Sequence, residues 1–146
     1  MRVSEDPRRR VPELAAALER RGLPHRWLPS GGAEDAAVTA WINTHFRFRG
    51  SQADWSAVPD HRSVAWSNEA EAAEALAQAV AGLEPRSLVT VTWGDAGLPS
   101  LEIALEDALA VAEAIFEASF DTWILERFRG WALELYHEGS MSWGFL

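Results

Sequence analysis

The sequence predicts an α+β domain with two layers, in which helices cover one face of a mostly antiparallel sheet. Three runs with a residue period of two follow one another between residues 122 and 145, and the turns between them are short enough for hairpins. Two upstream segments, over about 68–82 and 105–118, instead place apolar residues at helical spacing. Consecutive antiparallel strands with helices packed on them give this fold class.

Helical spacing and turn residues divide the first sixty residues. Pro12 suits the first turn of a helix, and apolar residues recur at helical spacing until Gly22, which favours a helix end. Pro and Gly residues then mark a loop, and the acidic Glu34 and Asp35 suit the first turn of a second helix. We therefore expect a helix over about 11–21, a loop over 22–32, a helix over 33–43, a short strand over 46–49 and a loop over 50–60.

The rest of the chain has a clearer pattern. Asn68 and Glu71 have the spacing of a capping box, in which the first side chain caps an amide and the second reaches back. Residues 88–93 are rich in β-branched side chains, and a turn signal follows them. The expected elements are strands over 63–66, 88–93 and 101–104, helices over 68–82 and 105–118, and a meander of strands over 122–126, 131–136 and 141–145.

The length of 146 residues fits a single domain that spans the whole chain. We expect residues 1–10 to form a flexible arm and residues 61–146 to form the best-defined part of the core. No stretch approaches the roughly 20 apolar residues that cross a bilayer, and no signal peptide is indicated. The absence of cysteine excludes disulfides and thiolate metal sites and is compatible with a reducing compartment, so the expected location is cytoplasmic.

The formal net charge of −9 is distributed unevenly along the chain. Residues 1–50 contain nine Arg and six acidic residues, a net charge of +3, whereas residues 51–146 contain four Arg and sixteen acidic residues, a net charge of −12. An acidic surface repels phosphate groups and attracts basic proteins. The later part of the chain is therefore not expected to bind nucleic acid or an anionic membrane directly.

Few residues have the arrangement that catalysis or metal binding requires. The four histidines lack ligand spacing, and no glycine-rich segment has the context of a phosphate-binding loop, so neither a metal nor a cofactor is expected. The best acid–base candidates are His137 and Glu138, near Glu134 and Tyr136, because a carboxylate can orient an imidazole. Strand alternation places Glu134 and Tyr136 on the face opposite His137. This favours a polar hairpin end over a catalytic site, and no catalytic residue is assigned.

Acidic residues and tryptophans are the candidates for partner binding. Glu106, Glu113 and Glu117 align on the outer face of the expected 105–118 helix, where they would steer a cationic protein. Most of the eight tryptophans are expected in the core, but Trp27 and Trp55 lie in loop-like segments, where use as interface anchors is most plausible. The full set of candidate partner-binding residues is Asp95, Glu102, Glu106, Glu113, Glu117, Asp121, Glu138, Trp27 and Trp55.

Part of the chain resembles known bacterial proteins. The segments FDTWIL (120–125) and GWALELYHEG (130–139) resemble the C-terminal hairpins of small immunity proteins from polymorphic-toxin and contact-dependent inhibition systems. The preceding segment, 98–109, is similar to the strand-to-helix passage of the deaminase-associated immunity proteins in that group. The resemblance covers about residues 89–146 and implies a non-enzymatic inhibitor that binds a cognate toxin domain.

Three functional hypotheses follow from these observations. The first is an immunity protein that binds and neutralises a cognate, basic toxin domain; the sequence leaves its oligomeric state open and favours a monomer. The alternative is a secretion chaperone or adaptor for an effector protein, since such proteins are also small and acidic but usually dimerise and expose an apolar groove. The third is a small enzyme that uses His137 and Glu138, which requires a deep pocket containing both residues.

Overall fold

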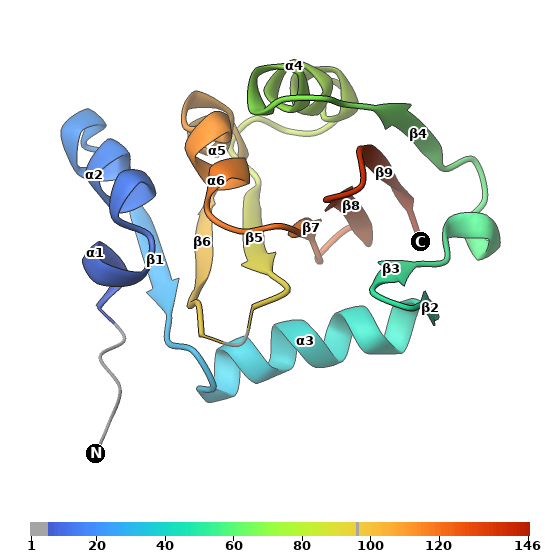
Figure 1. Ribbon diagram of the computed structural model, residues 1–146, viewed down its shortest axis with the longest axis horizontal. Coiled ribbons are helices and arrows are strands. Elements are labelled where there is room, and N and C mark those ends of the chain that lie inside the picture. The colour runs from blue at the N-terminus through green and yellow to red at the C-terminus, as the bar shows by residue number, and fades with distance from the viewer. Residues whose placement is uncertain (1–5, 96) are drawn as a thin grey trace.

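A seven-stranded sheet forms the centre of the computed structural model, which describes residues 6–95 and 97–146 (Figure 1). Every neighbouring pair of strands is antiparallel, which confirms the expected α+β class. The order across the sheet is β1 (His25–Leu28), β6 (Ser100–Ala104), β5 (Leu88–Trp93), β7 (Thr122–Glu126), β8 (Trp131–Tyr136), β9 (Ser140–Phe145) and β4 (Arg62–Ala65).

The last three strands form the expected meander. β7 pairs with β8, and β8 pairs with β9, in continuous register. Gly130 and Gly139 lie in the two connecting turns and have φ angles of 73° and 95°, a region that side chains other than glycine rarely enter. Every residue of β7 and β8 is buried, so both faces at the centre of the sheet must be covered.

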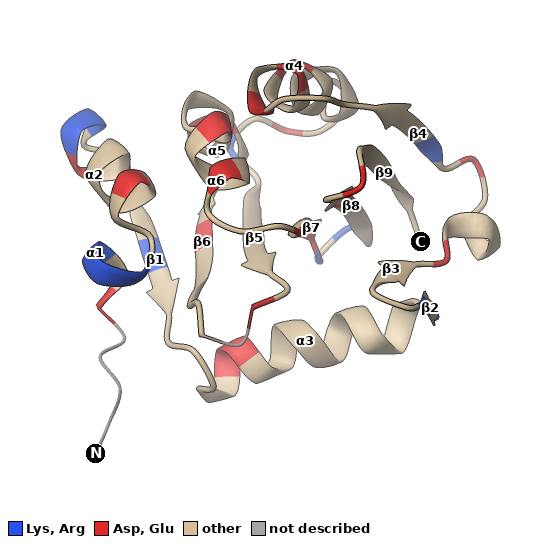
Figure 2. Ribbon diagram, in the orientation of Figure 1, with Lys and Arg blue, Asp and Glu red and all other residues tan. Residues whose placement is uncertain are grey.

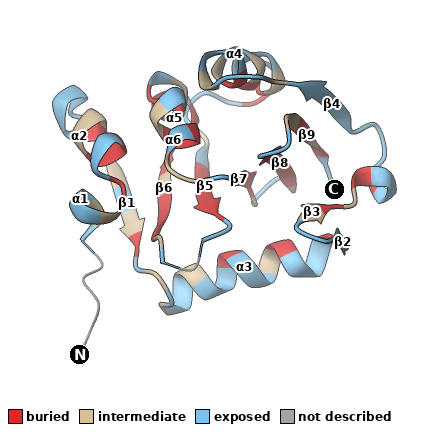
Figure 3. Cartoon of the chain, in the orientation of Figure 1, coloured by how far each residue is buried: buried red, intermediate tan, exposed pale blue. Residues whose placement is uncertain are grey.

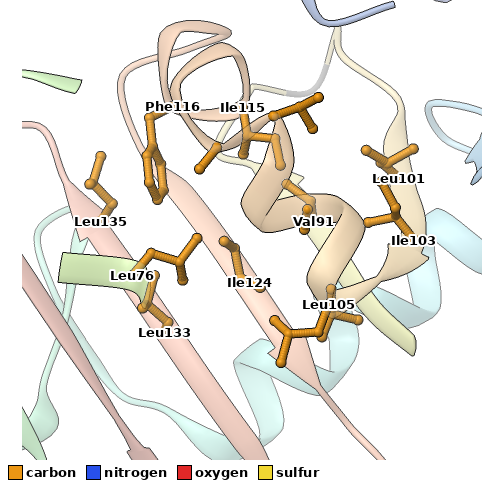
Figure 4. Close-up of a cluster of buried hydrophobic side chains, with 14 of the residues drawn as sticks. Leu76, Val91, Leu101, Ile103, Leu105, Ile115, Phe116, Ile124, Leu133 and Leu135 are labelled. Carbon is orange, nitrogen blue, oxygen red and sulfur yellow. The ribbon is translucent and has the colours of Figure 1, made fainter. Parts of the chain in front are cut away.

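Helices cover one face of the sheet, as expected. They are α2 (Pro12–Arg21), α4 (Glu69–Ala79), α5 (Leu105–Ala110) and α6 (Ala112–Glu117). Figure 4 shows how Leu76 and Ile115 from this layer meet Val91, Ile124 and Leu133 from the strands. β5, β6 and β8 give alternate side chains to this core, as a residue period of two requires.

The opposite face has a cover that the sequence did not predict. α3 (Ala33–His45) lies on the other side of the strands from α4, α5 and α6 (Figure 1), followed by the small hairpin β2 (Phe48–Arg49) and β3 (Gln52–Ala53) and the 3-10 helix η1 (Trp55–Ala57). Trp123 and Leu125, which alternate with Ile124, pack with Val38 and Phe46 in a second buried cluster. Figure 3 shows this pattern, with buried positions along the strands and on the side of α3 that faces them.

Two segments that the sequence assigns to loops contain regular structure. β1 forms inside the expected 22–32 loop, because pairing with β6 supplies the backbone hydrogen bonds that its four residues need. β3 and η1 form inside the expected 50–60 loop and are held by contacts with the sheet. In both cases the cause lies in residues far away in the sequence.

The expected helices also differ in their bounds. The helix expected over 105–118 is interrupted at Val111, whose φ of −122° and ψ of 23° lie outside the helical region. Residues 7–10 of the expected arm form one helical turn, α1 (Pro7–Arg10), and Arg8 forms an ion pair with Glu19 of α2. Residues 1–5 of that arm lie outside the described residues. None of the helices in the described part of the chain has the length and apolar character of a transmembrane span.

Candidate protein-binding surface

Four acidic side chains gather where α2, α4 and α6 meet. Partial desolvation by the surrounding chain raises the pKa of the exposed Glu117, and the negative charges of Glu13, Glu69 and Glu113 raise it further. Figure 2 shows acidic positions on all three helices. Within the described part of the chain, no arginine or histidine forms an ion pair with Glu69, Glu113 or Glu117. These three carboxylates therefore repel one another without being held in an ion pair by a described residue.

A shallow hollow adjoins this acidic group. It has a volume of about 240 Å³ and lies between the start of α2 and the end of α6, where Glu13 and Glu117 line it together with Arg10. Val11 and Ala118 supply apolar walls. The hollow therefore combines two carboxylates and the Arg10 guanidinium with an apolar lining, which suits a side chain that has an aliphatic stem and a polar head.

The connection from α6 to β7 adds an exposed aromatic side chain. Phe120 is 79% exposed and follows Glu117 by three residues. The next residue, Asp121, accepts a hydrogen bond from the backbone N–H of His137, and the same Oδ1 atom lies 2.9 Å from Nδ1 of the His137 imidazole. The ring of Phe120 meets the His137 ring edge to face, with 6.2 Å between centroids. Asp121 thus fixes the imidazole beside the exposed Phe120.

Two turns bring further carboxylates to the same end of the sheet. Gly94, at the end of β5, donates its backbone N–H to the carbonyl oxygen of Asp121 at 3.4 Å, so the following Asp95 lies near that residue. Glu138 lies next to His137 in the turn between β8 and β9 and is exposed. We call the combined set the acidic surface, and its residues are Glu13, Glu69, Asp95, Glu113, Glu117, Phe120, Asp121 and Glu138.

Comparison with known proteins does not assign this surface. No protein-family model matches the chain, and no curated protein matches it. Its function is therefore inferred from the chemistry of its own residues.

The predicted acids fall into two groups. Asp95, Glu113, Glu117, Asp121 and Glu138 belong to the acidic surface. Glu102 instead forms an ion pair with Arg26 on β1 at 3.3 Å, and Glu106 forms one with Arg86 at 2.8 Å. Because α5 and α6 are separate helices, the expected alignment of Glu106 with Glu113 and Glu117 along one continuous helix is also wrong.

The two tryptophans proposed as anchors are not on this surface. Trp55 is only 5% exposed, and its indole N–H donates a 2.9 Å hydrogen bond to Oε1 of Glu134, so its expected role as an anchor is wrong. Trp27 is half-buried on β1 and packs against the main core. Phe120 provides the exposed aromatic group instead. Its sequence signal is weak, a lone Phe among small and polar residues after a helix.

The proposed acid–base pair is arranged differently from the expectation. His137 is oriented by Asp121 and not by Glu138. Among the described residues, no hydroxyl group or second carboxylate hydrogen-bonds to the His137 ring, and no group of three or more His, Asp or Glu side chains is placed to hold a metal ion. The pair can position an imidazole. The Tyr136 ring lies beside it, with 4.5 Å between centroids, but among the described residues no hydroxyl group is hydrogen-bonded to the imidazole.

A buried carboxylate on the opposite face was not recognised from the sequence. Glu134 of β8 is 2% exposed, and its two oxygens accept hydrogen bonds from the Ala53 backbone N–H at 3.0 Å and from Trp55. Burial raises the pKa of Glu134, and these two hydrogen bonds oppose the shift. Both donors belong to the segment that contains β3 and η1, so Glu134 fastens that segment to the sheet.

Proposed function

We propose that this chain is a non-enzymatic immunity protein that binds and neutralises a basic bacterial toxin domain through the acidic surface. The observation that carries the proposal is the crowding of Glu13, Glu69 and Glu113 around Glu117 without an ion-pairing cation among the described residues. Lys or Arg side chains of a partner would relieve this repulsion on binding. The lack of cysteine is consistent with action in the cytoplasm of the producing cell.

The surface has two parts that act at different stages of binding. The exposed carboxylates create a field that raises the association rate of a basic protein and that salt screens. Phe120 supplies an aromatic side chain that a pocket of the partner would bury, as hot-spot residues do. The carboxylates should therefore mainly determine the association rate of the complex. Phe120 should mainly determine its dissociation rate.

The test is binding to the protein encoded next to this gene, measured by surface plasmon resonance at several salt concentrations. The double variant Glu113→Gln/Glu117→Gln should associate several-fold more slowly and show a flatter salt dependence. Its matched control, Glu84→Gln/Glu106→Gln, removes the same charge outside the acidic surface and should change the rate less. Phe120→Ala should mainly raise the dissociation rate, by about tenfold or more.

A growth assay connects this binding to function. Expression of the neighbouring gene alone should stop bacterial growth, and co-expression of this chain should restore it, whereas the Phe120→Ala variant should restore it less well. A harmless neighbour, or equal association rates for the two double variants, would contradict the proposal. An effector that needs this chain only to remain soluble would support the alternative of a secretion chaperone.

A further inference from the structure

β4 lies at one edge of the main sheet, and no described strand pairs with its outer side. All four of its residues are exposed, as Figure 3 shows along the length of the strand. Exposed edge strands present unpaired backbone groups that can pair with another chain.

The hydrogen-bond register identifies which backbone groups are free. The Trp66 N–H donates to the carbonyl oxygen of Gly139, just beyond the paired residues of β4 and β9. Hydrogen-bonded and non-hydrogen-bonded pairs alternate along an antiparallel ladder, so Val64 and Arg62 bond to β9. The N–H and C=O groups of Ser63 and Ala65 therefore point away from the sheet.

A groove runs beside this edge on the face that α4 covers. It has a volume of about 550 Å³ and is lined by Arg62, Ser63, Val64, Gln78, Ala79 and Trp143. Val64 is 37% exposed, and Trp143, opposite Arg62 on β9, is half-buried. The groove can therefore accept apolar side chains from a strand added to β4.

Arg62 indicates the charge of the occupant. It is the only charged residue among the six that line the groove, and it forms no ion pair with another described residue. A second copy of the chain, paired through its own β4, would bring another Arg62 and no acidic residue into the groove. A different protein with an acidic side chain at that position fits better.

We propose that the β4 edge binds an extended segment of a partner protein, with an aliphatic residue opposite Val64 and an acidic residue opposite Arg62. The segment pairs with the free backbone groups of Ser63 and Ala65 and adds an eighth strand to the sheet. Its intervening residues lie on the other face of the sheet, beside Ser63 and Ala65, where small polar side chains fit. This inference is independent of the proposed function.

A peptide titration followed by amide NMR tests the inference. The probe is acetyl-Thr-Val-Thr-Glu-Thr-Val-Thr-amide, whose symmetric sequence fits either strand direction. Chemical-shift changes should concentrate at Ser63, Ala65 and Trp143. Replacing the central Glu of the peptide with Lys should weaken binding by at least about threefold, and the Arg62→Glu variant should reverse this preference.

Two further measurements separate strand addition from other binding. Ala65→Pro removes an N–H that faces solvent, which edge strands tolerate, and should abolish peptide binding. A peptide N-methylated at its central residues should also fail to bind to the unaltered protein, so the test does not depend on the folding of the variant. Equal binding of the Glu and Lys peptides, or unchanged binding by Ala65→Pro, would overturn the proposal. So would a dimer in analytical ultracentrifugation that Ala65→Pro abolishes, since it would assign the edge to a second copy.

Discussion

At the scale of single residues, the buried Glu134 makes the most consequential contacts. Its carboxylate forms no ion pair with a described residue and accepts hydrogen bonds from Ala53 and Trp55. Removing one partner of a buried hydrogen bond to a charged group leaves the other group unsatisfied, which costs more than the bond contributes in net terms. The Glu134 carboxylate therefore adds a sensitive polar contact to the apolar packing that holds the 46–58 segment on the sheet.

The Trp55 indole offers a direct test of this attachment. Trp55→Phe removes the indole N–H that donates a hydrogen bond to Glu134, together with part of a buried ring. The free energy of unfolding should therefore fall by about 2–4 kcal/mol. Urea denaturation followed by circular dichroism measures the change. Trp41→Phe is the control, since the Trp41 ring is half-buried and its N–H has no hydrogen-bond partner among the described residues. Equal losses for both variants would show that the Glu134 hydrogen bond contributes little.

The ionisation of Glu134 should also appear in the pH dependence of stability. Its pKa in the folded state is raised above the ordinary 4.5, chiefly by burial. Below pH 4.5 the Glu134 carboxyl group is protonated in both the folded and the unfolded state. As the pH rises, this group ionises freely in the unfolded state, whereas in the folded state its ionisation requires a buried charge. The stability of the native protein relative to Glu134→Gln should therefore fall as pH rises from about 4 to 7. A relative stability that rises over this range would show that the two hydrogen bonds outweigh burial.

At the scale of elements, the start of α4 lies where the local sequence predicts it, at Asn68. The Asn68 side chain accepts a hydrogen bond from the Glu71 backbone N–H at 2.9 Å, as the sequence spacing indicates. Glu71 reaches back one residue further than a capping box requires, to the backbone N–H of Ser67. The helix start is therefore determined within five consecutive residues.

A substitution at the α4 cap measures that contribution. Asn68→Ala leaves the Glu71 amide without its acceptor and should lower the free energy of unfolding by about 1 kcal/mol. Asn68→Asp, which keeps an acceptor oxygen and adds a negative charge at the helix N-terminus, should retain the stability. Thermal and urea unfolding of both variants checks this. An unaffected Asn68→Ala protein would mean that packing of Ala72 and Leu76 alone fixes the helix start.

Other elements depend on distant partners. β1 has only four residues and one fully buried side chain, Leu28, so its own sequence carries little strand signal. The buried Val111 separates α5 from α6, although the apolar residues on either side of it keep the spacing of one continuous helix. Neither feature is visible in a local pattern, because packing against the sheet decides both.

At the scale of the whole molecule, the distribution of charge matters more than its total. Two arginines of the Arg-rich first third pair with acids of the same third, Arg8 with Glu19 and Arg26 with Glu34, and Arg26 also pairs with Glu102 of β6. Glu117 and its acidic neighbours have no such pairing among the described residues. Folding therefore brings four carboxylates without an ion-pairing partner among the described residues to one part of the surface.

This concentration predicts a salt effect on stability. Glu117→Gln should raise the melting temperature at low ionic strength by less than about 3 °C, because it removes repulsion among partly exposed charges. The increase should disappear in about 0.5 M NaCl, where the repulsion is screened. Differential scanning calorimetry measures both conditions. If the melting temperature of Glu117→Gln stays higher at high salt, the gain would come from removing a partly desolvated carboxylate and not from reduced repulsion.

The sequence by itself determined the fold class, the meander, the start of α4 and the excess of acid after residue 50, because each arises from periodicity, turn chemistry or composition within a short segment. Only the tertiary structure decided that Trp55 is buried, that Glu102 and Glu106 are paired with arginines, and that Glu13 and Glu69 join Glu113 and Glu117. These outcomes depend on residues brought together from separate elements. Exposure and ion pairing are properties of the packed chain, and no local pattern encodes them.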